Sequence, residues 1–304
     1  MKIGIVGLGK LGKIHARIYH KSTNADIACL CDINKTRLKE TADILNINPY
    51  STQDYKKVLN KKVSAVSIAT DTSSHYEITK FFLENGVHCL VEKPLVTDIK
   101  QAKNLLSIAR KNKKLLMVGL VERFNSAYQV VKKLAKKPRF IECHRLSCYP
   151  HRSLDISVIL DLMIHDLDII LDLVKDKVTS VEAVGVNVLS QDLDIANVRL
   201  KFKKGCVANI TSSRVSQEQT RKIRIFLPSA YISLDYANQE AEIYKKQKNE
   251  IQRQQIHIEK DEPLKKEIQN FLYSIHKKLK DYASTHQAIT ALGLALKIEK
   301  KACR

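Results

Sequence analysis

The stretch KIGIVGLGKLG, residues 2–12, decides the fold, because a short apolar strand runs directly into a glycine-rich turn that opens a helix. In this context Gly7 permits the tight turn, Gly9 lets a diphosphate approach the backbone, and Gly12 lets the helix pack closely on the strand. Asp32 ends the next predicted strand, where an acid binds the ribose hydroxyls of an adenosine. The segment therefore predicts a dinucleotide-binding βαβ unit.

Short β-branched runs alternate with helix-length segments as far as residue 119. We predict strands at 2–6, 26–31, 47–51, 64–69, 87–91 and 115–119, and helices at 11–20, 34–45, 74–85 and 98–111. Continuous apolar strands that alternate with helices are typical of a doubly wound parallel sheet. We expect residues 1–119 to form a Rossmann domain.

The pattern changes after residue 119, where polar alternation replaces continuous apolar strands. We predict helices at 126–136, 264–280 and about 285–301, a further helix around 160–168, and strands at 139–148, 180–189, 195–202, 206–213, 221–227, 231–234, 242–246 and 251–258. The chain is therefore expected to be α/β, with a second α+β domain at 120–304 that carries a large open, mainly antiparallel sheet. Such a sheet favours self-association, so we expect a homodimer or homotetramer.

The chain has 304 residues, is 44% hydrophobic and carries a formal net charge of +20. Its lysines are spread over many helices without a nucleic-acid motif, so a solvated surface is favoured over nucleic-acid binding. No apolar run is long enough for a membrane span, and charged residues follow the first strand at once, so we expect a cytoplasmic chain without membrane partners. The seven cysteines contain no CxxC pair, which favours reduced, buried thiols.

The segment LDLMIHDLD, residues 160–168, predicts an apolar helix that carries ionisable side chains. Asp161 and His165 are four residues apart, so they share a face of this helix. Three interpretations compete: a proton-transfer site, a metal site and a solvated stripe. Metal catalysis normally needs further histidines converging from other helices, and the ten histidines here show no such grouping, so we expect no metal. Asp168 and Asp172 are expected to form the solvent edge of the helix.

A lysine also ends a predicted parallel strand, in VEKP at residues 91–94, and such a position faces the crevice where ligands bind. With the tripeptide Glu92-Lys93-Pro94 inside this segment, the chain resembles the Gfo/Idh/MocA family of oxidoreductases. The resemblance rests on an ordered set of motifs along the whole chain: Gly7-Leu8-Gly9-Lys10-Leu11-Gly12, Glu92-Lys93-Pro94, Glu122-Arg123-Phe124-Asn125 and Asp161-Leu162-Met163-Ile164-His165-Asp166.

The resemblance implies three kinds of site residue. The catalytic residues are Lys93, Asp161 and His165, with the helix pair facing Lys93 and the nicotinamide across the domain cleft. The cofactor-binding residues are Gly7, Leu8, Gly9, Lys10, Leu11, Gly12, Asp32, Thr70, Thr72, His75, Glu92, Lys93 and Arg123. The substrate-binding residues are Lys93, Asn125, Tyr149, His151, Arg152, Asp161 and His165. Asp71 departs from the family pattern, which often has proline there.

The implied reaction is oxidation of a secondary alcohol. Imidazole titrates near neutral pH, so His165 accepts the proton, Asp161 orients the imidazole or the substrate, and Lys93 polarises the reacting oxygen. NAD is the expected cofactor, because Asp32 would repel a 2′-phosphate. Lys35 and Arg37 lie close enough in the sequence to leave NADP open.

The segments 148–171 and 213–236 resemble a subgroup that oxidises nucleotide-linked amino sugars, which implies the 3-hydroxyl of UDP-N-acetylglucosamine as the reacting group and a 3-keto sugar that feeds lipid A synthesis. Tyr149, His151 and Arg152 could reach the substrate diphosphate, or they form a polar loop. A dehydrogenase of a free polyol such as inositol is the alternative. A non-catalytic dinucleotide-binding protein is a further one.

Overall fold

The computed structural model describes residues 1–149, 156–248, 250–279 and 282–303. The chain divides into two compact units, each of which is described by itself. The first unit comprises Met1–Gly119 and Leu264–Ile289, and the second comprises Leu120–Pro263 and Thr290–Arg304.

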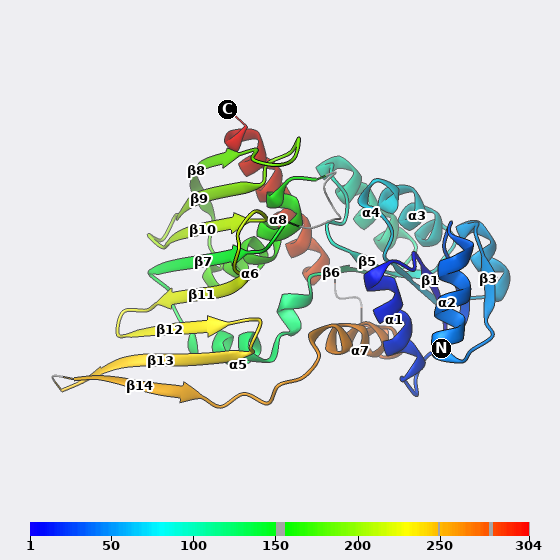
Figure 1. Cartoon of the computed structure of the whole chain (residues 1–304), viewed down its shortest axis with the longest axis horizontal. Coiled ribbons are helices and arrows are strands. Elements are labelled where there is room, and N and C mark those ends of the chain that lie inside the picture. Colours follow the sequence, from blue (N-terminus) through cyan, green and yellow to red (C-terminus); the bar gives the residue numbers. More distant parts are fainter. Residues whose placement is uncertain (150–155, 249, 280–281, 304) are drawn as a thin grey trace. The chain divides into compact units, whose positions relative to one another are not determined.

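The first unit is built on a parallel sheet of six strands in the order β3-β2-β1-β4-β5-β6 (Figure 1). Its elements are β1 (Lys2–Val6), α1 (Lys10–His20), β2 (Asp26–Cys31), α2 (Lys35–Leu45), β3 (Tyr50–Thr52), the 3-10 helix η1 (Tyr55–Lys61), β4 (Ala65–Ile68), α3 (Thr72–Glu84), β5 (His88–Glu92), α4 (Ile99–Lys111), β6 (Leu116–Gly119), α7 (Pro263–His276) and the beginning of α8 (Ala283–Ala302). Strands β4 and β6 are buried along their whole length, as their continuous apolar sequences predict.

The strand order of this sheet reverses between β1 and β4, since β2 and β3 lie on one side of β1 and β5 and β6 lie beyond β4. Right-handed crossovers that run in opposite directions place their helices on opposite faces, so α1 and α2 cover one face and α3 and α4 the other. In a doubly wound sheet a ligand binds at the carboxyl ends of the strands where the order reverses. Here those ends belong to β1 and β4.

The second unit contains a sheet of eight strands in the order β14-β13-β12-β11-β7-β10-β9-β8. Its elements are the 3-10 helix η2 (Val121–Phe124), α5 (Ser126–Leu134), β7 (Phe140–Leu146), the π-helical turn η3 (Ile159–Met163), α6 (Ile164–Val174), β8 (Val178–Val186), β9 (Ile195–Phe202), β10 (Val207–Ser213), β11 (Thr220–Phe226), β12 (Ala230–Asp235), β13 (Glu240–Gln247), β14 (Glu250–Ile256) and the end of α8. All neighbouring strands are antiparallel except β7 and β10, which are parallel.

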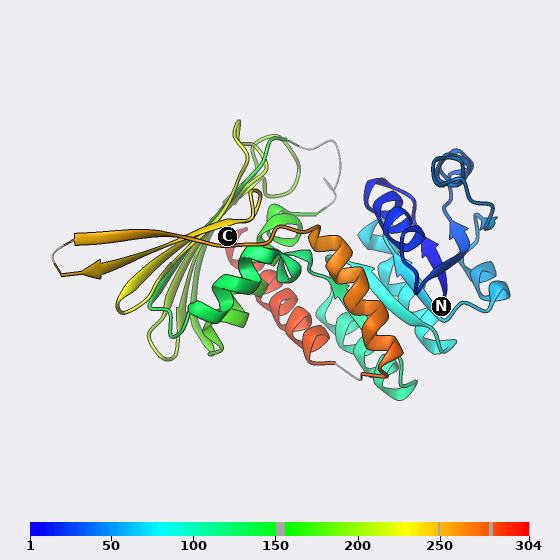
Figure 2. The same ribbon diagram turned by 90° about the horizontal axis from the view of Figure 1, so that it is seen from below.

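One face of the eight-stranded sheet is apolar and buried. Along β9, for example, every second residue is buried and the residues between them are mostly exposed. Figure 2 shows α5, α6 and the end of α8 on one side of this sheet, while β13 and β14 extend past the other strands as a hairpin. The core of the unit therefore lies between the sheet and these helices.

The predicted α/β fold class is confirmed, and each predicted strand and helix is present with ends that differ by a few residues. The structure differs from the sequence-based expectation in two places. The segment 159–163 is π-helical, and residues 264–289 belong to the first unit although we expected them in the second domain. The amphipathic pattern of α7 predicts a buried face, formed by Ile268, Phe271 and Leu272, but does not identify the surface that covers it.

None of the helices in the described part of the chain combines the length and the apolarity that a membrane span requires.

Candidate active site

The glycine-rich turn after β1 has the geometry that a dinucleotide needs. Gly7 has φ +90°, and a Cβ atom there would lie 2.6 Å from the backbone of Ala69. A Cβ atom at Gly12 would lie 1.8 Å from the carbonyl oxygen of Gly7, so the turn and the helix pack as closely as the sequence predicts. Gly9 has open space where its Cβ would be, and α1 begins at the next residue without a side-chain cap. The free N–H groups at the start of α1 fit a diphosphate.

Asp32 lies beside this turn at the end of β2 and is buried. Its carboxylate accepts hydrogen bonds from the backbone N–H of Leu8 at 2.6 Å and of Asn34 at 2.8 Å. The guanidinium of Arg37 lies 3.9 Å from the same carboxylate. The acid is therefore held at the glycine turn, as a ribose-binding residue must be, and one half-exposed cation stands next to it.

The residues after β4 are linked to those after β5. Thr70 accepts a hydrogen bond from the hydroxyl of Ser74 at 2.7 Å, and Thr72 is the first residue of α3. The ring of His75 lies 2.9 Å from the carbonyl oxygen of Pro94 through Nδ1 and 3.1 Å from that of Thr70 through Nε2. Burial lowers the pKa of His75. His75 thus connects the two loops that follow neighbouring strands, and its contact with a cofactor stays a prediction.

Glu92 and Lys93 stand at the carboxyl end of β5, next in the sheet to β4. Glu92 is buried, and its carboxylate lies 2.9 Å from Nε2 of His15 on α1. The other ring nitrogen of His15 lies 2.6 Å from the hydroxyl of Ser67 on β4. Burial raises the pKa of Glu92, but His15 and the neighbouring Lys93 outweigh that effect, so the pKa lies below its usual value. Glu92 is therefore an anion directly before the half-buried Lys93, which precedes a cis Lys93–Pro94 bond.

His15 and Ser67 are site residues that the sequence analysis missed. The available signal is the position of His15 on the first helix, one turn after Gly12. Residues three or four apart on a helix share a face, so a histidine there points to the same side as the close packing of Gly12 on β1. Ser67 gives no signal of its own, because a serine inside an apolar strand has many possible partners.

Asp161 and His165 are in the second unit, on the segment in which the π-helical turn η3 passes into α6. Asp161 is partly exposed and its N–H donates to the carbonyl oxygen of Ser157 at 2.9 Å, while His165 is 8% exposed. Single π-helical turns inside helices are frequent at functional sites. The turn widens the helix at Asp161, which the spacing of an ordinary α-helix does not predict.

Asp166, the residue after His165, is completely enclosed by the protein. Arg145 of β7 donates to it through Nε at 2.8 Å and through Nη2 at 2.9 Å, and its third nitrogen donates to Glu122 at 2.9 Å. Burial raises the pKa of Asp166, and the guanidinium of Arg145 opposes that shift. One arginine therefore joins η2, β7 and α6 at the residue that follows His165.

The expectation that Asp168 forms a solvent edge of the helix is wrong. Asp168 is 1% exposed and accepts two hydrogen bonds from Arg123, at 2.6 and 2.5 Å. Asp172 is half-buried and is bonded to Lys132 at 2.5 Å and to the hydroxyl of Tyr128. Sequence spacing cannot identify these partners, because they lie on η2 and α5. Arg123, predicted to bind the cofactor, uses its guanidinium to hold α6.

The remaining predicted substrate residues are Asn125, Tyr149, His151 and Arg152. Asn125 is buried, caps α5 by accepting from the N–H of Ala127 at 3.1 Å, and donates to the carbonyl oxygen of Tyr236 at 3.0 Å. The hydroxyl of Tyr149 lies 3.5 Å from the carbonyl oxygen of Leu189. His151 and Arg152 lie outside the described residues. The substrate contacts of all four stay predictions.

Potential metal ligands are not grouped within the described ranges, where no three His, Cys, Asp or Glu side chains lie close enough together to hold an ion. Five of the seven cysteines are buried, and burial raises the pKa of Cys29 and Cys31 to about 12. Such thiols are protonated and unreactive near neutral pH.

Comparison with known proteins identifies both parts of the chain. The family described as an oxidoreductase family with an NAD-binding Rossmann fold (GFO_IDH_MocA) matches residues 1–120, and the GFO/IDH/MocA C-terminal domain matches residues 138–233. The UDP-N-acetylglucosamine 3-dehydrogenase of Acidithiobacillus ferrooxidans is 35% identical over 282 residues, which span 90% of this chain and 88% of that protein.

Two further comparisons bear on the fold and on the range of relatives. A solved structure of the Acidithiobacillus ferrooxidans enzyme superposes with a TM-score of 0.92 at 33% identity and covers 99% of this chain and 97% of its own. The myo-inositol 2-dehydrogenase of Thermotoga maritima is 25% identical over 229 residues, 70% of this chain and 69% of that protein. Relatives with nucleotide-sugar and with polyol substrates therefore both occur.

Proposed function

Because the chain belongs to the Gfo/Idh/MocA family of oxidoreductases, we propose that it oxidises the 3-hydroxyl of UDP-N-acetylglucosamine to the 3-keto sugar with NAD. The observation that carries the proposal is the similarity to a UDP-N-acetylglucosamine 3-dehydrogenase over nearly the whole of both chains. The first unit is the NAD-binding Rossmann domain of the family. The second unit supplies the residues that select the sugar.

The dinucleotide is held by the turn Gly7–Gly12, by Asp32 and by the loops after β4 and β5. The open space at Gly9 admits the diphosphate, and Asp32 binds the ribose hydroxyls. When bound, nicotinamide supplies the hydride acceptor. Thr70, Thr72 and Lys93 stand at the strand ends that face such a ligand.

Lys93, Asp161 and His165 carry the proton chemistry in this proposal. The ammonium of Lys93 donates a hydrogen bond to the substrate oxygen and stabilises its alkoxide character. His165 removes the hydroxyl proton, and Asp161 orients the imidazole or the sugar. The buried anions Glu92 and Asp166, each next in sequence to one of these residues and held by a partner in its own unit, support them in fixed positions.

A substrate panel tests the reaction and separates the two classes of substrate. Purified protein is mixed with NAD and, in turn, UDP-N-acetylglucosamine, its uronic acid, myo-inositol and glucose, and NADH is followed by absorbance. We expect turnover with UDP-N-acetylglucosamine. Turnover with the unphosphorylated compounds alone would assign the chain to polyol oxidation, which the inositol dehydrogenase relatives make the alternative.

Substitution of His165 and of Lys93 tests the mechanism. His165→Asn and Lys93→Met should each slow hydride transfer in a single turnover by about 100-fold or more, because a positioned acid or base contributes on that order. The matched controls are His257→Asn and Lys57→Met, since both side chains are exposed. Near-normal hydride transfer in His165→Asn, with NAD still bound, would remove His165 from the mechanism.

A further inference from the structure

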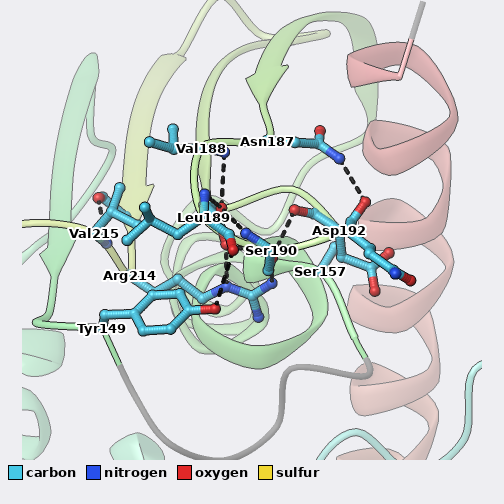
Figure 3. A network of polar contacts seen from close by, with 12 residues as sticks. Tyr149, Ser157, Asn187, Val188, Leu189, Ser190, Asp192, Arg214 and Val215 are labelled. Carbon is cyan, nitrogen blue, oxygen red and sulfur yellow. Dashed lines mark hydrogen bonds and ion pairs between the residues drawn. The ribbon is translucent and has the colours of Figure 1, made fainter.

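A fully buried ion pair lies in the second unit and takes no part in the mechanism described above. Arg214, just after β10, and Asp194, just before β9, are both 0% exposed, and Nε of Arg214 donates to Oδ1 of Asp194 at 2.8 Å. The backbone N–H of Arg214 also donates to the carbonyl oxygen of Asp194 at 2.9 Å. Figure 3 shows the arginine at the centre of a polar network beneath the loop 187–192.

Asp194 organises that loop. Its Oδ2 accepts from three successive backbone N–H groups, those of Val188 at 2.8 Å, Leu189 at 2.6 Å and Ser190 at 2.9 Å. Its Oδ1 accepts from the hydroxyl of Ser190 at 2.6 Å. Burial raises the pKa of Asp194, but the hydrogen bonds from Ser190, Leu189 and Arg214 outweigh it and hold the pKa far below its usual value. The carboxylate of Asp194 is therefore an anion, and the loop 187–192 folds around it.

Arg214 connects this anion to the chain that leads into the predicted catalytic turn. Its Nη1 donates to the carbonyl oxygen of Ile156 at 2.8 Å, and Nη2 lies 2.8 Å from the hydroxyl oxygen of Ser190. The next residues are held as well, because the N–H of Val158 donates to the carbonyl oxygen of Leu193 at 2.9 Å. Ser157 donates to the carboxylate of Glu299 on α8. Residues 156–158 are thus fixed on three sides, immediately before the turn that carries Asp161.

A buried ion pair contributes little net stability compared with apolar residues of the same size, because both charges lose their hydration. The ion pair instead provides a defined geometry, because the N–H groups of a planar guanidinium point in fixed directions and so fix the positions of the groups that they bind. Here that arrangement includes the carbonyl group of Ile156. An error of about 1 Å in the position of a catalytic group can cost about 100-fold in rate, so a rigid start to this helix bears directly on chemistry.

We propose that Arg214, together with Asp194, is a positioning residue for the catalytic helix: the pair fixes residues 156–158, and through them the π-helical turn and the placing of Asp161 and His165. This inference rests on the proposed function for the roles of Asp161 and His165. It adds a pair that touches neither substrate nor cofactor and that acts from the loop before β9 and the end of β10.

The first test reads the position of His165 without any reaction. Histidines are labelled with nitrogen-15, and the imidazole resonance of His165 is assigned with the His165→Asn variant. We expect Arg214→Lys to shift this resonance, because lysine keeps the charge but cannot reach Asp194, Ser190 and Ile156 together. The matched control is Arg224→Lys, since Arg224 of β11 is half-exposed and pairs with Glu142 at 3.1 Å on the surface. A resonance that stays in place in Arg214→Lys overturns the proposal.

If Arg214→Lys does not fold, Ser190→Ala serves instead, because it removes one hydrogen bond from each member of the pair and leaves the pair in place. We expect a smaller shift of the same resonance. No shift in this folded variant contradicts the proposal equally.

The second test measures turnover on the substrate identified by the panel. We expect kcat of Arg214→Lys to fall by about 10- to 100-fold while the Kd for NAD changes by less than about 2-fold, because the dinucleotide is bound by the first unit. An unchanged kcat overturns the proposal. Failure of the proposed function is a separate outcome: wild-type protein would then not turn over UDP-N-acetylglucosamine, and the imidazole resonance would still report the positioning.

Discussion

Arg145 and Asp166 form a two-point ion pair, with Nε and Nη2 of the arginine 2.8 and 2.9 Å from the two carboxylate oxygens. Asp166 follows His165 in the chain, so this pair fixes the backbone of the predicted proton acceptor from the side of β7. The same arginine neutralises Glu122 at 2.9 Å. Two carboxylates therefore depend on one buried cation.

Removal of that cation should destabilise the second unit. We expect Arg145→Met to lower the free energy of unfolding by about 3–5 kcal/mol, because two carboxylates remain buried without their partner. Burial already raises the pKa of Asp166, and the loss of Arg145 raises it further, so the destabilisation should shrink at low pH where the carboxyl groups are protonated. Urea denaturation at neutral and acidic pH measures both effects. Arg224→Met is the control, and an equal loss there would refute the special role of Arg145.

Two glycines of the turn should respond differently to alanine. A Cβ at Gly12 meets the carbonyl oxygen of Gly7 at 1.8 Å, so Gly12→Ala must displace α1 from β1 and lower the melting temperature. A Cβ at Gly9 meets nothing, so Gly9→Ala should keep the melting temperature within a few degrees and weaken NAD binding, because the methyl group occupies the approach of the diphosphate. Thermal denaturation with and without NAD, together with titration calorimetry, separates the two. Unchanged NAD affinity in Gly9→Ala would argue against the diphosphate at this turn.

Asp32 should control the preference for NAD over NADP. Its carboxylate repels a 2′-phosphate, whereas Arg37, 3.9 Å away, would attract one. Asp32→Ser removes the anion and leaves the cation, so the ratio of kcat/KM for NADP to that for NAD should rise by about 10-fold or more. The double variant Asp32→Ser with Arg37→Ala should lose most of that gain. A ratio that does not change in the single variant would show that another group selects the cofactor.

The stability of the second unit should depend on Asp194 in acid. The folded-state pKa of Asp194 is depressed, so the protein gains stability from it above the unfolded value of about 3.9 and loses that stability as the pH falls below this value. Asp194→Asn should therefore destabilise the protein by about 3–5 kcal/mol near neutral pH, where Arg214 loses its counter-ion, and by progressively less below about pH 4. Melting temperatures of wild type and variant over this range provide the measurement. Parallel curves for the two proteins would contradict the assignment.

Much of the fold can be predicted from sequence, because the spacing of apolar residues along the chain indicates directly which faces of a strand or helix are buried. The continuous apolar strands of the first unit and the alternating strands of the second have different periods, and both sheets follow from them. The glycine turn is predictable for a further reason. At Gly7 and Gly12 any side chain would collide with the neighbouring backbone, and the required spacing is local.

The buried charges of the second unit could not be predicted in the same way. Asp166 and Asp168 resemble solvated residues on a helix, because the arginines that neutralise them come from β7 and η2. Local sequence reports how polar a residue is, whereas burial of a charge depends on a partner distant in the chain. The π-helical turn is hidden for a different reason: residues 159–164 are apolar except for Asp161, so the sequence has no clear polar face in which a shift by one residue could be seen.

The helix α8 belongs to the first unit up to Ile289 and to the second from Thr290, and α7 before it lies wholly within the first except for its initial proline. A chain cut at residue 119 would therefore leave the nucleotide-binding half without two of its own helical segments, among them the buried Phe271. A hybrid of two relatives with a single crossover at residue 119 would have a first unit assembled from two different proteins. A chimera that keeps both units whole needs two more crossovers, one between Pro263 and Leu264 and one inside α8 between Ile289 and Thr290, so the two units of this architecture cannot be recombined by simple fusion.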